Sequence, residues 1–278
     1  GMAFTHQYRF AAAESVEKDK VPRAISIMLL GGIVSAFLGT SMANYGKDIV
    51  TDQLYVGSYL SLAILTIIPA IFLLFYQNTS KLASNVKYSG RSVFELILQP
   101  RFLQALVASA FGYAIMTFLL TATPLSMHVM EKMSLSKTGL VIQFHVVAMF
   151  LPSLITGNLV KKFGHSNIMY AGVFLYSITI IASFFDQTYY NYMFALIFLG
   201  LGWNFLFISG TSLLVLTYKE EEKFKAQGLN DFIVYSVHAT GSLSAGVLLM
   251  LTNWKMMNLL CIPFLILIIL TTLRAALL

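Results

Sequence analysis

Eight long apolar runs constrain the fold of this chain more than any other feature. They lie near 24–44, 55–76, 102–125, 138–158, 167–185, 189–217, 229–251 and 256–273. A helix rising ~1.5 Å per residue crosses ~30 Å of hydrocarbon in each of them. Backbone groups in lipid must satisfy one another, and the alternating pattern of barrel strands is absent. The sequence therefore predicts an all-α polytopic membrane protein with eight transmembrane helices.

The placement of the cations predicts the orientation of these spans. Of the 18 Lys and Arg residues, one set of alternate loops carries Arg9, Lys18, Lys20, Arg23, Lys81, Lys87, Arg91, Arg101, Lys161, Lys162, Lys219, Lys223, Lys225 and Arg274. The opposite loops carry Lys47, Lys132, Lys137 and Lys255. Because Lys and Arg accumulate in cytoplasmic loops, we predict that both ends of this chain face the cytoplasm. The net charge of +6 then reflects topology and anionic lipid, and no nucleic-acid partner is needed to explain it.

An internal repeat is suggested by two segments about 205 residues apart. Residues 14–39 and 218–246 both run from a mixed-charge loop into a span with Gly and Ser near its middle. If the first and seventh spans are equivalent, the repeat contains six helices, as in transporters built from two parallel halves. The alternative is that such loops and small-residue spans recur by chance in any protein of this kind.

The stretch TGNLVKKFGHSN between the fourth and fifth runs carries a family resemblance. Gly157, Leu159, Lys161, Lys162, Gly164 and His165 resemble the inner-loop motif of the major facilitator superfamily, Gly-x-Leu-x-Asp-Arg-x-Gly-Arg, in its second copy. Lys161 stands at the Asp position of that motif and His165 at its final Arg. The segments TATPLSM, VIQFHVVAMFLPSLITG, GWNFLF and QGLNDF resemble a bacterial branch of the superfamily that includes a riboflavin transporter.

This resemblance implies a domain organisation. Residues 1–23 would be an inner loop and the end of a preceding helix, 24–76 the last two helices of the N-terminal bundle, 77–101 a cytoplasmic linker and 102–278 the complete C-terminal six-helix bundle. The chain would then be a fragment, helices five to twelve of a major facilitator fold. The expected location is the cytoplasmic membrane of a bacterium, and the full-length protein is expected to be monomeric.

Polar side chains in the third and fourth runs are candidates for substrate binding, because such groups usually face a bundle interior or a cavity. Tyr113, Thr117 and Thr121 form one stripe, although their hydroxyls could instead bond backbone carbonyls. Gln143 and His145 lie about 200° apart around their helix, so one of them should meet a neighbouring helix. For His145, substrate or proton contact competes with hydrogen-bonded packing.

The sixth and seventh runs supply the remaining candidates. The Asn204 amide needs partners that a ligand could provide, and Trp203 could stack on a planar ligand or pack in the core. Asp231 and His238 share a helix face about 10 Å apart and could hold or pass a proton. The alternative is that Asp231 only sits in the first turn of its helix, where the helix dipole favours a negative charge, and that Asn230 caps the helix.

The resemblance implies a secondary transporter that moves a small organic solute, riboflavin-like or another drug or metabolite, by alternating access. Proton coupling through Asp231 and His238 is one hypothesis. No catalytic residue, cofactor or metal site is expected. The rival classes are a structural or sensor protein and a membrane enzyme. The enzyme is disfavoured because the sequence has no H-E-x-x-H, G-x-S-x-G or Walker motif and a single cysteine, Cys261.

Overall fold

The computed structural model describes residues 2–46, 49–50, 55–75 and 90–277, and every regular element within them is a helix. Eight helical segments in this part of the chain are long and apolar enough to cross a membrane. The predicted all-α polytopic class with eight spans is therefore confirmed. Lys47, Lys81, Lys87 and most of the predicted linker, 77–89, lie outside the described residues.

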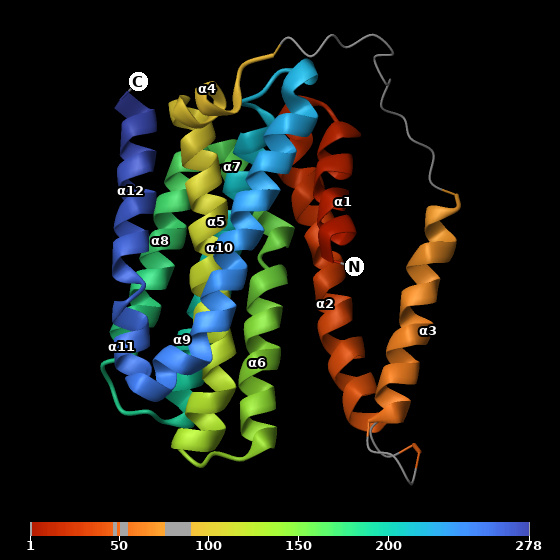
Figure 1. The fold of residues 1–278 in the computed structure, drawn as a ribbon, viewed down its shortest axis with the longest axis vertical. Coiled ribbons are helices and arrows are strands. Elements are labelled where there is room, and N and C mark those ends of the chain that lie inside the picture. Colours follow the sequence, from red (N-terminus) through yellow and green to blue (C-terminus); the bar gives the residue numbers. More distant parts are fainter. Residues whose placement is uncertain (1, 47–48, 51–54, 76–89, 278) are drawn as a thin grey trace.

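The helices form one packed bundle with two further spans at its side (Figure 1). In chain order they are α1 (Met2–Glu14), η1 (Lys18–Lys20), α2 (Val21–Gly46), α3 (Val56–Leu73), α4 (Val93–Leu98), α5 (Pro100–Pro124), η2 (Leu125–Met130), α6 (Leu135–Phe150), α7 (Ser153–Phe163), α8 (His165–Ala182), α9 (Tyr189–Val215), η3 (Glu220–Glu222), α10 (Lys223–Leu251), α11 (Trp254–Leu259) and α12 (Ile262–Leu277). Helices α5 to α12 make up the bundle, α1 and α2 pack against it, and α3 stands apart beside α2.

Two predicted spans are each divided into two helices. The run at 138–158 is α6 followed by α7, with the break at Leu151 and Pro152. Pro152 has no N–H for the helix ladder, and its ring crowds the preceding turn. The last run is α11 followed by α12, and Pro263 occupies the first turn of the second helix, where a proline is tolerated. The apolar runs predicted the spans but not these breaks.

Helices α5 and α9 run through the centre of the bundle and are buried along most of their length. Two polar side chains of α8 bond to the backbones of these central helices. The Tyr176 hydroxyl on α8 donates to the Gly112 carbonyl at 2.6 Å, and Thr179 donates to the Ala195 carbonyl at 3.1 Å. Such bonds hold neighbouring helices together where no water is available to compete.

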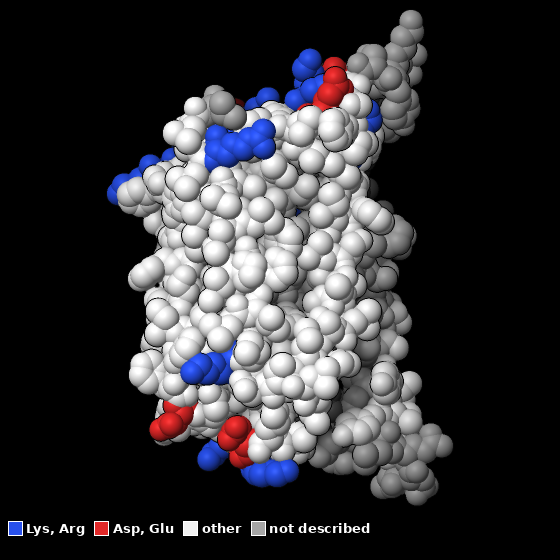
Figure 2. Space-filling view, turned by 60° about the vertical axis from the view of Figure 1, so that its left-hand side comes forward, with Lys and Arg blue, Asp and Glu red and all other residues white. Residues whose placement is uncertain are grey.

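The charged side chains gather at the two ends of the molecule, with a wide uncharged band between them on the face seen in Figure 2. Arg9 does not follow this pattern. The distribution of cations predicted a loop position for Arg9, but the structure places it on α1 with no exposed surface. That assignment was wrong because helix α1 packs beside α2 and near α9, so Arg9 faces protein and not water.

Helix α2 buries side chains in its first half, whereas most of the large apolar side chains described in its second half are exposed. Val21, Ile25 and Ser26 are buried in the first half. Farther along the helix, Val34 and Phe37 are 59% and 50% exposed. In Figure 1, α2 correspondingly lies close to the bundle near α7 and diverges from α6 toward the opposite end. The bundle and α2 therefore meet at the end of the molecule where α7 joins α8.

Candidate functional site

Three predicted site residues meet in an aromatic cluster, which we define as Tyr113, Phe150, Trp203, Phe207 and His238. The Tyr113 ring centroid lies 4.7 Å from that of His238 and 5.6 Å from that of Trp203. The Trp203 ring stacks on Phe207 at 4.8 Å and meets Phe150 edge-on at 5.7 Å. Helices α5, α6, α9 and α10 thus converge on one set of flat side chains.

One polar atom in this cluster is buried without a hydrogen-bond partner in the described part of the chain. The Trp203 ring is 2% exposed, yet its Nε1–H makes no hydrogen bond with any described residue. A buried indole N–H normally finds an acceptor. The cluster therefore combines apolar ring faces with an unused donor, which suits a flat ligand that carries acceptor atoms.

The threonines of the predicted stripe lie on the same helix as Tyr113. Thr117 is buried, and Thr121 is half-buried with its hydroxyl 3.4 Å from that of Ser242 on α10. This contact joins α5 to α10 on the side of the aromatic cluster. The stripe is therefore at a helix–helix contact, and its contribution to a ligand site stays a prediction.

On α6 the two polar candidates separate, as their spacing required. His145 is fully buried, and its Nδ1 lies 2.7 Å from the Leu196 carbonyl of α9. Gln143 is half-buried. His145 is thus the member of the pair that meets a neighbouring helix, and it packs α6 against α9.

Asn204 braces the break between α6 and α7. Its Nδ2 donates to the Met149 carbonyl at 2.6 Å and to Ser153 Oγ at 2.7 Å, while its Oδ1 accepts from the Thr156 hydroxyl at 2.7 Å. These contacts use both ends of the amide that was predicted to bind a ligand. Asn204 is therefore not among the residues that we propose for the substrate site.

Asp231 pairs with a residue that sequence reasoning missed. Its carboxylate receives a hydrogen bond and ion pair from Arg9 Nη2, a second hydrogen bond from Gln7 Nε2 at 2.7 Å, and a third from Asn230 Nδ2 at 3.1 Å. The side chains of Arg9 and Asp231 are 1% and 11% exposed. This buried pair links α1 to α10 across 222 positions of sequence.

The Arg9 guanidinium also touches aromatic rings. Its Cζ lies 5.1 Å from the ring centroid of Phe207 and 4.6 Å from that of Phe10, a geometry that favours a cation. Its Nε and Nη1 make no hydrogen bond with any described residue. Arg9 thus connects the Asp231 carboxylate to the aromatic cluster and leaves two donors unused.

The predicted Asp231–His238 relay has no direct contact in the described part of the chain. His238 is half-buried against Tyr113, and its ring centroid is 6.5 Å from that of Tyr235, one turn closer to Asp231. A cavity of about 440 Å³ lies beside this face of α10 and is lined by Gln7, Asp231 and Tyr235 among others. Asp231 and His238 therefore share a face without sharing a hydrogen bond.

The inner-loop motif forms the contact between α7 and α2. An added Cβ on Gly157 would lie 2.7 Å from the Arg23 Cα and 2.8 Å from the Pro22 carbonyl oxygen, so only a glycine allows this approach. Leu159 packs on the core. Lys161 Nζ pairs with Asp19 Oδ2 at 2.8 Å, and both side chains are more than half exposed. Lys161 stands where the motif has an Asp, and the carboxylate at this contact comes instead from Asp19, just before α2.

The remaining motif residues shape the turn into α8. Gly164 has φ of +84°, a conformation that glycine adopts without strain, and it ends α7. Lys162 is exposed, with its Nζ 5.0 Å from the Phe163 ring centroid. His165 is the half-buried first residue of α8. The motif thus acts in this fold through backbone geometry and one ion pair.

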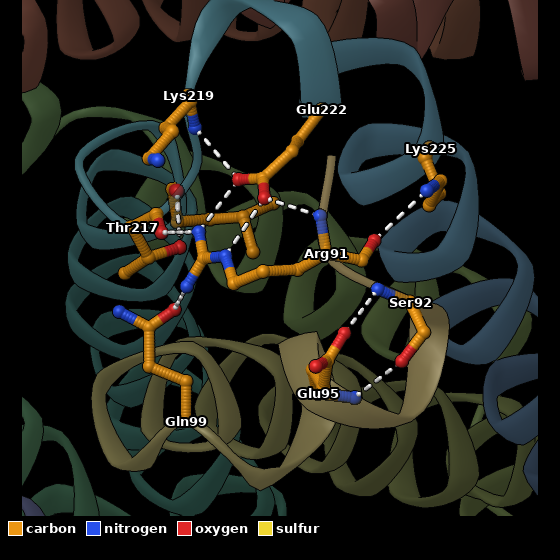
Figure 3. Close-up of polar contacts among 9 residues, drawn as sticks. Arg91, Ser92, Glu95, Gln99, Thr217, Lys219, Glu222 and Lys225 are labelled. Carbon is orange, nitrogen blue, oxygen red and sulfur yellow. Dashed lines mark hydrogen bonds and ion pairs between the residues drawn. The ribbon is translucent and has the colours of Figure 1, made fainter. Parts of the chain in front are cut away.

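A second charge cluster fixes the segment before α5, at the end of the bundle where α4 lies (Figure 3). Arg91 Nε and Nη2 donate to the two Glu222 carboxylate oxygens at 2.7 and 2.6 Å, and the Arg91 backbone N–H donates to Oε1 at 2.9 Å. The hydrogen bond to Glu222 raises the pKa of Arg91 above its usual value. We call this contact the Arg91–Glu222 clamp.

Three further contacts surround the clamp. Arg91 also donates to the Thr217 carbonyl at 3.0 Å and to Gln99 Oε1 at 2.7 Å, and Lys225 Nζ donates to the Arg91 carbonyl at 2.8 Å. The segment before α5 is thereby bound to the connection between α9 and α10. Because α10 carries Asp231 and His238, the clamp holds the start of the helix that bears the predicted coupling residues.

The fold and the site define a polytopic helical membrane protein with a charged and aromatic interior. A model of the Major Facilitator Superfamily matches residues 121–277. The riboflavin transporter RfnT of Brucella anthropi is 36% identical over 269 residues, which cover 96% of this chain and 67% of the relative. The chain belongs to the Major Facilitator Superfamily, and the predicted resemblance is confirmed.

Other comparisons agree with this membership. The MFS-type transporter YddS of Bacillus subtilis is 28% identical over 277 residues, covering 93% of this chain and 63% of that protein. Among solved structures, a bacterial homologue of the iron transporter ferroportin in an outward-facing state has the same fold, with a TM-score of 0.65, 14% identity, and coverage of 95% and 66% of the two chains. The chain spans about two thirds of the length of these curated relatives.

Proposed function

We propose that this chain is the larger part of a secondary transporter that moves a flat, riboflavin-like solute across the cytoplasmic membrane of a bacterium. The similarity to a riboflavin transporter over 96% of the chain supports the substrate class. The aromatic cluster supports it independently, because rings from four helices meet beside a buried indole N–H that has no hydrogen-bond partner among the described residues. The isoalloxazine ring of riboflavin offers both a flat surface and carbonyl acceptors to such a site.

The proposed binding residues are those of the aromatic cluster, together with Thr117, Thr121, Gln143 and Arg9. The Nε and Nη1 donors of Arg9, next to the Phe207 ring, suit ring carbonyl oxygens. The relatives are longer than this chain, and we propose that the additional helices of a full-length protein complete the site. We further propose that the end bearing Lys161 and Lys219 is cytoplasmic and that the full-length protein is a monomer.

Riboflavin uptake by the full-length protein tests this proposal. Trp203→Phe keeps an aromatic ring but removes the unpaired N–H, so a lost hydrogen bond of ~0.5–1.5 kcal/mol should raise the KM about two- to tenfold. Tyr190→Phe is the matched control, because Tyr190 lies on the same helix and is 79% exposed. No uptake by the unmodified protein would reject the substrate, and an unchanged KM in Trp203→Phe would remove Trp203 from the site.

We propose that transport proceeds by alternating access, with the contact between α2 and α7 closing the cation-rich end. The close approach at Gly157, together with the burial of Ile25 and Ser26 and the exposure of Val34 and Phe37, supports a state closed at that end and open at the other. We also propose that a proton on Asp231 releases Arg9, and so loosens α1 from α10 when the closed end opens.

Gly157→Val should shift this equilibrium toward opening at the cation-rich end. The new side chain overlaps the backbone of Pro22 and Arg23, and overpacking of ~1–3 kcal/mol moves a two-state equilibrium roughly 5- to 150-fold. Single-cysteine reporters at Ser26, which is 1% exposed at this contact, and at Phe37 would measure labelling at the two ends, with the buried Cys261 replaced by Ala.

We expect faster labelling at Ser26 and slower labelling at Phe37. Gly139→Val is the matched control, since a Cβ at Gly139 meets nothing within 4 Å. If both labelling rates stay unchanged in Gly157→Val, this contact does not control access.

A further inference from the structure

A cavity of about 580 Å³ opens at the cation-rich end, between the α1–α2 connection and α7. It lies apart from the aromatic cluster and from the Arg9–Asp231 pair. Its charged lining consists of Asp19, Lys20, Arg23 and Lys161. One wall is apolar and includes Val16 from the connection and Ala24, Ile27 and Met28 from α2. The cavity therefore has a polar mouth beside a hydrocarbon-like wall.

The mouth of this cavity carries more positive than negative charge. Three cations face one carboxylate, and that carboxylate, Asp19, is engaged by Lys161 at 2.8 Å. Lys20 is drawn to Glu17 at 2.8 Å. Arg23 is exposed and forms no ion pair with any described residue. A guanidinium with all its donors available is suited to bind a phosphate through two parallel hydrogen bonds.

The apolar wall indicates what kind of phosphate would bind. Ile27 lies one turn along α2 from Arg23 and is 58% exposed, on a helix that begins at Val21 and continues as a membrane span. An acyl chain that followed this face of α2 would leave its headgroup at Arg23. A free phosphate ion would use the cations but gain nothing from Ile27 and Met28. We propose that this cavity binds the headgroup of one anionic phospholipid.

Such a lipid would connect the two sides of the contact. Arg23 belongs to α2, whereas Lys161 belongs to α7 beside the close approach at Gly157. A phosphate between them would replace Asp19 as the partner of Lys161 and would also bind Arg23. It would therefore bridge α2 and α7 through two cations, whereas the exposed Lys161–Asp19 pair uses one. Anionic lipid therefore stabilises the state in which α2 and α7 are in contact. This inference does not depend on the substrate of the transporter.

The test compares full-length protein in nanodiscs of phosphatidylcholine with and without 20% phosphatidylglycerol, with bound lipid counted by native mass spectrometry. Since each cation near an anionic surface contributes ~1 kcal/mol, or about fivefold in affinity, the double variant Arg23→Gln, Lys161→Gln should bind phosphatidylglycerol roughly 25-fold more weakly. Lys162→Gln is the matched control, because Lys162 is adjacent and exposed but does not line the cavity.

We expect Lys162→Gln to keep both the bound lipid and the rise in melting temperature that phosphatidylglycerol produces. We expect the double variant to lose both. Equal losses in the two variants would show attraction by general surface charge and overturn the proposal. Inorganic phosphate that protects the protein as well as phosphatidylglycerol would overturn the lipid assignment. Both results leave the riboflavin uptake proposal untouched, because none of these residues belongs to the aromatic cluster.

Discussion

Arg9→Met should lower the free energy of unfolding by about 3–5 kcal/mol and abolish transport, because it leaves the Asp231 carboxylate buried without a cation. Gln7 and Asn230 would still donate to the carboxylate, but neither carries a charge. Asp231→Asn should be similarly costly, since it leaves a fully buried guanidinium unpaired. Reversible unfolding of the full-length protein in detergent, with uptake measured alongside, gives both quantities.

The double variant Arg9→Met, Asp231→Asn separates the ion pair from the individual residues. Replacing both partners removes both buried charges, so we expect it to be more stable than either single variant. Its uptake should no longer respond to a pH gradient, because the proposed proton site is gone. Strictly additive losses of stability would show that the two side chains do not interact, and an intact pH response in Asp231→Asn would exclude Asp231 from coupling.

The spans were predictable from sequence because each depends on one local property, a run of about 20 apolar residues. The motif glycines were predictable by a different route, because the family motif marked Gly157 and Gly164; the first lies at a close approach between helices and the second has a positive φ. Hydropathy does not predict where a span breaks into two helices. Pro152 is visible in the sequence, but its neighbour Asn204, which bonds to Met149 and Ser153 across that break, is 52 residues away along the chain.

Pairing between distant charges was the part that sequence reasoning could not supply. Arg9 sits in the stretch YRFAAAE, and its aromatic and alanine neighbours were the available signal that it lies on a buried helix face. The charge rule counted it as a loop cation because the stretch is too short to register as a span. The partner of Lys161 was missed likewise, since Asp19 is 142 positions away and belongs to no motif.

The Arg91–Glu222 clamp leads to the second large effect. The Glu222 side chain is 1% exposed, and Arg91 is its cationic partner in two parallel hydrogen bonds. Arg91→Met would leave that carboxylate with only backbone donors such as the Lys219 N–H at 3.0 Å. We expect a loss of about 2–3 kcal/mol in the free energy of unfolding, because hydrogen bonds to charged groups contribute ~1.5–3 kcal/mol and the Arg91 side chain is 31% exposed.

Arg91→Lys tests whether geometry or charge matters in the clamp. A lysine keeps the positive charge but cannot make the forked contact with both carboxylate oxygens or reach Gln99 and Thr217 at the same time, so it should recover less than half of the loss. Arg274→Met is the control, because Arg274 is an exposed cation at the end of α12 and pairs with no described residue.

Since the clamp fixes the connection that leads into α10, Arg91→Met should also slow transport while leaving the KM for substrate within about twofold, as expected when the binding residues are intact. A large rise in KM with normal stability would mean instead that Arg91 acts on the substrate site.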